Sequence, residues 1–130
     1  LSIRRQRQMC KETGAGVVVS ISVTNDGNAI SLPRLTFACT GAAASGLTIE
    51  RLVNGVARDT LQYTGPIGAG QNLEIDCRAL RVTLEGVAAY AAFSATHPAW
   101  LPLSPGVNVL RVTMPSGGGK LRVIYPHTWY

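Results

Sequence analysis

Apolar and polar residues alternate along much of this chain with a period of two. The first clear case is the segment 17–24, in which Val19, Ile21 and Val23 alternate with serine or threonine. A half-buried strand has this pattern, because successive side chains of a strand point to opposite faces. The alternation recurs in later segments. It predicts one core formed by Val19, Ile21, Val23, Ile49, Ile75, Val82, Leu84, Leu110, Val112 and Val123.

Turn-forming pairs separate the apolar segments, and they stand at Asp26 and Gly27, Asn54 and Gly55, and Pro105 and Gly106. Asn-Gly between two apolar runs is the strongest short hairpin signal, since both residues tolerate positive φ. Pro-Gly fits the central positions of a type II turn. Asn108 follows the last pair, and we expect its side chain to bond to the backbone of that loop.

The number and spacing of these segments predict the fold class. Residues 30–39 read as a strand that Pro33 interrupts, so we expect it to be bulged or at a sheet edge. Residues 87–94 are ambiguous, because their alanines permit a helical turn whereas Tyr90 and Phe93 suit a strand. About eight short strands in all predict an all-β domain over residues 17–130, an antiparallel β-sandwich of the jelly-roll type.

The first sixteen residues lack the alternation and carry Arg4, Arg5 and Arg7. We interpret residues 1–16 as an irregular basic arm or linker. Such a segment suits docking on an acidic neighbour and becoming ordered only there.

The charge of the chain does not favour nucleic acid as its main partner. The net charge of +5 comes from 12 basic and 7 acidic residues. Outside the arm, the arginines are scattered along the predicted strands, so a solvated surface explains them better than a phosphate-binding site. With 46% hydrophobic and only 15% charged residues, the surface is expected to meet a protein partner. No apolar run is long enough for a membrane span.

The residues that usually carry catalysis do not group. Cys10, Cys39 and Cys77 are odd in number and too widely spaced for a zinc site or a closed disulfide set. Cys39 and Cys77 fall at inward strand positions, so we expect them to be buried thiols, in a protein assembled in a reducing cytoplasm. His97 and His127 have no ligand partner at metal spacing. We therefore expect no enzyme activity, no metal and no cofactor.

Five segments carry a resemblance to a known family by their order and spacing. They are the turn at 24–28 followed by Pro33, the strand and glycine turn at 49–55, the hairpin that starts at 70–77, the aromatic-Leu-Pro-Gly-x-Asn corner at 100–108, and the closing strand at 123–129. In this order they resemble the C-terminal domain of phage distal tail proteins and related minor tail proteins of long-tailed phages. The resemblance spans about four fifths of the chain, from Asp26 onward.

The resemblance implies a galectin-like β-sandwich and a structural virion protein without catalysis. Such a protein joins the tail tube to the tip or baseplate by contacts with other tail proteins, as part of a homo-oligomeric ring. It would be located in the phage tail after assembly in the host cytoplasm. The family also has a ring-forming domain before this one, where this sequence has only the basic arm. That difference leaves open which tail component the chain is.

A second hypothesis is a carbohydrate-binding module that contacts glycans of the host cell surface. Aromatic rings stack on sugars, and galectin-like sheets offer a shallow groove for them. The candidate stacking residues are Trp100, Trp129 and Tyr63. The same tryptophans would plug the ends of the core if the domain is purely structural.

Overall fold

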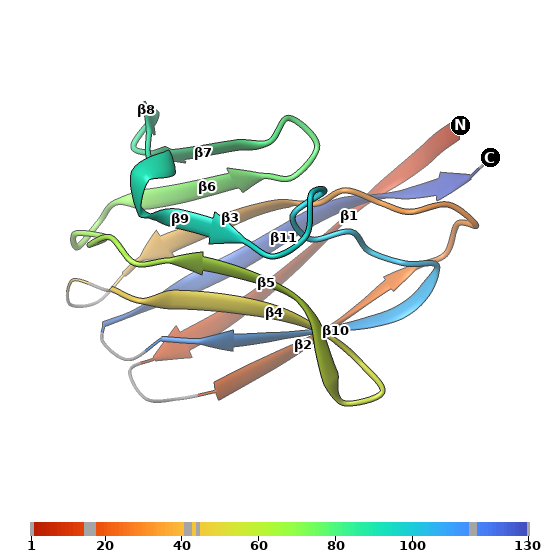
Figure 1. Cartoon of the computed structure of the whole chain (residues 1–130), viewed down its shortest axis with the longest axis horizontal. Helices are drawn as coiled ribbons and strands as arrows, with labels where there is room; N and C mark the ends of the chain where they lie inside the picture. The colour runs from red at the N-terminus through yellow and green to blue at the C-terminus, as the bar shows by residue number, and fades with distance from the viewer. Residues whose placement is uncertain (1, 15–17, 41–42, 44, 115–116, 130) are drawn as a thin grey trace.

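The computed structural model describes the backbone of residues 2–14, 18–40, 43, 45–114 and 117–129, and the side chains of 18–40, 43, 45–114 and 117–126. These residues form two antiparallel β-sheets that enclose one core (Figure 1). The predicted all-β sandwich is confirmed. The described residues form eleven strands where about eight were predicted, because the sequence reading missed the first strand and two very short ones.

The first sheet has six strands, and its order is β1 (Ser2–Gly14), β11 (Gly118–Trp129), β3 (Arg34–Cys39), β6 (Asn72–Asp76), β7 (Arg81–Leu84) and β8 (Val87–Ala88). The second sheet has five strands, and its order is β2 (Val18–Asn25), β10 (Gly106–Thr113), β4 (Leu47–Val53), β5 (Val56–Tyr63) and β9 (Phe93–Ala95). Consecutive elements lie in different sheets at several points, as in β2 to β3 and β10 to β11. The chain therefore crosses repeatedly between the layers and ties them together.

The inner faces of both sheets supply the core, as the alternation predicts. Eight of the ten predicted core residues are buried. The other two, Val19 and Leu84, are half-buried, and Leu84 packs against the core. Phe37, Leu73 and Leu121 add large side chains from the six-stranded sheet. Because these residues come from strands far apart in the chain, the core links the whole described sandwich into one unit.

The first segment of the chain differs from its prediction. Residues predicted to be an irregular arm form β1, which pairs with β11 from Ser2 opposite Trp129 to Gly14 opposite Gly118. Figure 1 shows the two strands side by side, with both ends of the chain at the same side of the molecule. The segment has no apolar alternation that would identify it as a strand. What places it in the sheet is its backbone pairing with β11. The prediction of an irregular segment there was therefore wrong.

Two further segments refine the sequence reading. Strand β3 begins at Arg34, after Pro33, and Ser31 forms only an isolated bridge with Leu103. Proline cannot donate to the ladder, which explains why the strand starts later than residue 30. The expected bulge or edge position is wrong, because β3 lies between β11 and β6 and pairs with both without a register shift. The ambiguous segment contains both kinds of structure, with a 3₁₀ turn at Tyr90–Ala92 between the short strands β8 and β9.

Cys39 and Cys77 are buried, as the sequence predicted. Burial raises the pKa of the Cys77 thiol to about 12, because the thiolate would lose its hydration. We expect Cys77 to resist iodoacetamide at pH 8 in the native protein and to react once the chain is unfolded, as mass spectrometry of its peptide would show. Rapid native-state labelling would contradict this.

The raised pKa of Cys77 also predicts how the free energy of unfolding changes at high pH. The folded pKa of Cys77 lies above the ordinary value of 9.0, so the folded state keeps a proton that the unfolded chain releases. Cys77 therefore lowers the free energy of unfolding progressively as pH rises from 9 toward 12, and has no such effect below 9.

Candidate interaction site

A tight corner links the segment after β9 to β10, and Asn108 holds it. The Ser104 N–H donates to Asn108 Oδ1 at 3.0 Å, and Asn108 Nδ2 donates to the carbonyls of Ser104 at 2.8 Å and Gly106 at 3.2 Å. Gly106 has φ +94°, which suits the third position of the predicted type II turn after Pro105. The prediction that Asn108 bonds to the loop backbone is confirmed.

Asn25, the last residue of β2, fixes a second corner. It lies opposite Gly106 of the first corner. Its Oδ1 accepts from Gly27 N–H at 3.0 Å, and its Nδ2 donates to the carbonyls of Ala29 at 2.8 Å and Leu103 at 3.2 Å. The reversal predicted at Asp26 and Gly27 is present, although Gly27 does not adopt positive φ. The asparagine side chain makes the turn instead, by bonding to the backbone two residues on.

A buried ion pair lies beneath the first corner, and the sequence reading missed it. Arg51 Nε donates to Asp59 Oδ2 at 2.5 Å, and the two side chains are only 11% and 4% exposed. Arg51 Nη1 also donates to Ser104 Oγ at 3.1 Å and lies 3.5 Å from Asn108 Oδ1. The ion pair therefore joins the β4–β5 hairpin to the corner before β10.

The signal for this pair is present in the sequence. Leu47, Ile49 and Arg51 follow one another at inward positions of β4, so the period of two places an arginine where a core residue is expected. Arg51 lies opposite Asp59 in the register of β4 and β5. An inward arginine next to an inward aspartate on the same predicted hairpin indicates a buried ion pair.

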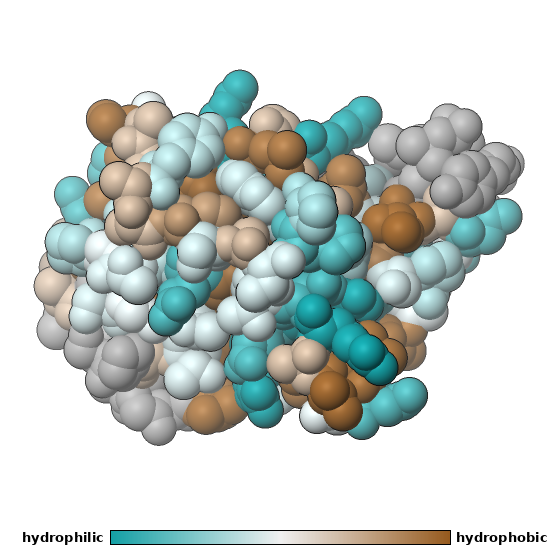
Figure 2. Space-filling view, viewed as in Figure 1, coloured by the Kyte–Doolittle hydropathy of each residue, from teal (hydrophilic) through white to brown (hydrophobic). Residues whose placement is uncertain are grey.

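The β4–β5 hairpin ends in the turn that the sequence predicted. Asn54 and Gly55 have φ of +52° and +78°, as a two-residue type I′ turn requires. Val56, at the start of β5, is 57% exposed, and Figure 2 shows hydrophobic residues on the surface where Figure 1 places the tip of this hairpin.

The exposed apolar residues of this hairpin continue across the sheet. Val109 lies opposite Leu52, and Leu52 lies opposite Ala57, so apolar residues of β10, β4 and β5 share the outer face. Val107, next to Asn108, is 69% exposed. We call Leu52, Val53, Val56, Val107 and Val109 the apolar end of the five-stranded sheet.

The three aromatic residues considered for sugar stacking do not form a platform. Tyr63 is 4% exposed and belongs to the core, so it presents no ring to a ligand. Trp100 is half-buried, packs against the core and lies with its ring centroid 4.6 Å from that of Phe93. The side chain of Trp129 lies outside the described residues, as do those of Arg4, Arg5 and Arg7, whose backbone belongs to β1.

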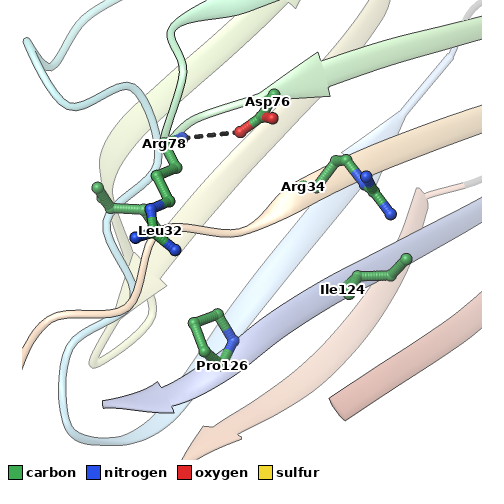
Figure 3. A pocket seen from close by; sticks show the side chains of 6 residues that line it. All are labelled: Leu32, Arg34, Asp76, Arg78, Ile124 and Pro126. Carbon is green, nitrogen blue, oxygen red and sulfur yellow. Dashed lines mark hydrogen bonds between the residues drawn. The ribbon is translucent and has the colours of Figure 1, made fainter. Parts of the chain in front are cut away.

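The outer face of the six-stranded sheet carries a hollow of about 220 Å³. Arg34, Asp76 and Arg78 surround it, and its apolar lining comes from Leu32, Ile124 and Pro126 (Figure 3). Within the described part of the chain, no three His, Cys, Asp or Glu residues group as a metal site would need. No helix there is long and apolar enough to cross a membrane.

The fold and these surfaces define a β-sandwich module that is suited to protein contacts. The family model for the C-terminal domain of siphovirus-type tail components matches residues 26–129. The chain belongs to this family of siphovirus-type tail components, and its place is therefore the virion. The family that the five sequence segments resembled is thereby confirmed.

One solved structure supports the same fold. The crystal structure of the Dit protein of phage SPP1 matches with a TM-score of 0.65 and 13% sequence identity, over 92% of this chain and 46% of that one. Dit is described there as a paradigm of the hub adsorption apparatus in phages that infect Gram-positive bacteria. The present chain thus spans less than half the length of Dit. The curated proteins gave no significant match.

Proposed function

We propose that this domain joins the tail tube to the tail tip or baseplate through protein–protein contacts, as part of a homo-oligomeric ring assembled in the host cytoplasm. The observation that carries the proposal is the apolar end, where Val56 and Val107 expose 57% and 69% of their surface. Exposed valines on a well-ordered sheet are costly in water and favourable in an interface.

Strand β1 offers a second contact to a neighbouring subunit. It is the first strand in the order of its sheet, so one of its edges has no partner strand among the described residues. An open edge of thirteen residues is a template for pairing with another chain. The arm that the sequence indicated thus contacts the adjacent subunit as an edge strand. In a cyclic ring the same contact recurs at every subunit.

Substituting Val56 with serine is expected to weaken ring assembly at least about fivefold, because the buried valine contributes roughly 1 kcal/mol or more to each contact. Val18 is the matched control, since it is also 57% exposed but lies at the far end of β2. Native mass spectrometry or light scattering would measure the assembly constant. Equal assembly of V56S, V18S and the unmodified chain would contradict the role of the apolar end.

The carbohydrate-binding alternative has less support. Tyr63 is buried, and Trp100 packs against Phe93 and the core. A glycan array with the purified chain tests it directly. Binding that is lost in Trp100→Ala, with the fold intact, would favour the lectin hypothesis, whereas an array without binding supports the structural role.

A further inference from the structure

Basic side chains gather on the outer face of the six-stranded sheet. The exposed ones are Arg34, Arg78, Arg81, Lys120 and Arg122. Strand pairing places several of them on neighbouring strands. Arg34 and Arg81 both lie opposite Asp76, and Arg122 is two residues from Ile124, which lies opposite Arg34. We call these five residues the basic face. Among the described side chains the face also holds two acidic residues, Glu74 and Asp76, so these side chains together carry a net positive charge.

The cations of the basic face are not neutralised within the described part of the chain. The ion pairs there join Arg51 to Asp59 and Arg111 to Glu50, both in the five-stranded sheet. Asp76 Oδ1 instead accepts from the backbone N–H groups of Arg78 at 3.0 Å and Ala79 at 3.1 Å, which closes the turn after β6. The guanidinium groups of the basic face therefore remain available for an external anion.

The hollow within this face favours a ligand that also carries an apolar group. Arg34 and Arg78 line it, and Leu32, Ile124 and Pro126 add apolar side chains to its lining (Figure 3). Its volume of about 220 Å³ suits one or two apolar side chains. Two arginines beside an apolar surface match a segment in which carboxylates flank an apolar residue, because arginine binds carboxylates with directed hydrogen bonds.

We propose that the basic face binds an acidic, apolar-containing segment of a different tail protein, with an apolar side chain in the hollow and carboxylates on Arg34 and Arg78. This deepens the proposed function and rests on it in naming a tail protein as the partner. A duplex nucleic acid fits less well, since Glu74 and Asp76 would face its phosphates and the apolar surface would meet none of its groups.

The described side chains of a second copy of this chain do not supply the acidic complement. The chain has seven acidic residues. Glu50 and Asp59 are held in ion pairs, and Glu74 and Asp76 lie on the basic face itself. Among the described side chains only Asp26 and Glu85 remain, and they lie on separate turns. The described acidic side chains therefore favour a different protein as the partner, and the basic face is then distinct from the contact that closes a ring of identical subunits.

Fluorescence anisotropy with a labelled peptide of alternating glutamate and leucine tests the proposal on the whole chain. We expect salt-sensitive binding that weakens at least about tenfold in Arg34→Glu, because the reversal places like charges together. Arg58→Glu is the matched control, with the same change of charge at an exposed position of β5 in the other sheet. We expect it to bind like the unmodified chain.

Three outcomes would overturn the proposal: no binding of the peptide, equal loss in Arg34→Glu and Arg58→Glu, or equal binding of a peptide with glutamine in place of glutamate. Tighter binding of a DNA duplex, lost in Arg34→Glu, would assign the face to nucleic acid instead. Ring assembly measured on the same Arg34→Glu sample separates this proposal from the proposed function. Assembly is expected to be unchanged, since the apolar end and β1 are intact.

Discussion

Replacing Asp59 with alanine is expected to lower the free energy of unfolding by about 3–5 kcal/mol, the range for removing one partner of a buried ion pair. The Arg51 guanidinium would keep its buried position, with 11% of the side chain exposed, but lose the carboxylate that compensates its charge. Ser104 and Asn108 are its remaining contacts, and neither is charged. Urea unfolding followed by circular dichroism measures the change. The unfolding midpoint should fall while the m-value stays the same.

The second ion pair of the same sheet provides the control. Arg111 and Glu50 lie 3.0 Å apart on neighbouring strands, but Arg111 is 38% exposed. An exposed pair contributes little to stability, so Glu50→Ala is expected to lower the free energy of unfolding far less than Asp59→Ala. If Asp59→Ala and Glu50→Ala have equal effects, burial does not determine the strength of the Arg51–Asp59 pair, and the predicted role of that pair is wrong.

The parts of the fold that the sequence predicted depend on local physical chemistry. Alternation of Ile21 and Val23 with serine reports which face of a strand is buried, wherever its partner lies. Asn54, Gly55 and Gly106 report positive φ, which few other residues adopt. These signals predicted the sandwich, most of its core and two of its turns without any knowledge of which strands pair.

The parts that the sequence did not predict depend on contacts between distant segments. Strand β1 has no alternation of its own and is ordered by pairing with β11, more than a hundred residues away. The basic face is visible only once β3, β6, β7 and β11 are known to be neighbours. Tyr63 was considered a ligand-binding residue because its residue type suits stacking, but the register of β5 points it into the core.

Asn108→Ala is expected to lower the free energy of unfolding by about 2–3 kcal/mol, because backbone groups of a partly buried corner lose their partners, and a buried polar group without a partner costs about 1–3 kcal/mol. Asn108 is 2% exposed, and its side chain satisfies the N–H and the carbonyl of Ser104 together with the carbonyl of Gly106. Alanine offers none of these bonds. Asn72→Ala, at an exposed position of β6, is the control, with a change expected within about 0.5 kcal/mol.

Asn108→Ala is also expected to affect ring assembly. Val107, the most exposed valine of the apolar end, lies between Gly106 and Asn108, so the corner that Asn108 holds also sets where this valine points. We therefore expect Asn108→Ala to weaken ring assembly even under conditions in which the variant is fully folded, and Asn72→Ala to leave it unchanged. Native mass spectrometry well below the unfolding midpoint separates the two effects. Normal assembly of folded Asn108→Ala would show that the corner stabilises the sandwich without ordering its interface.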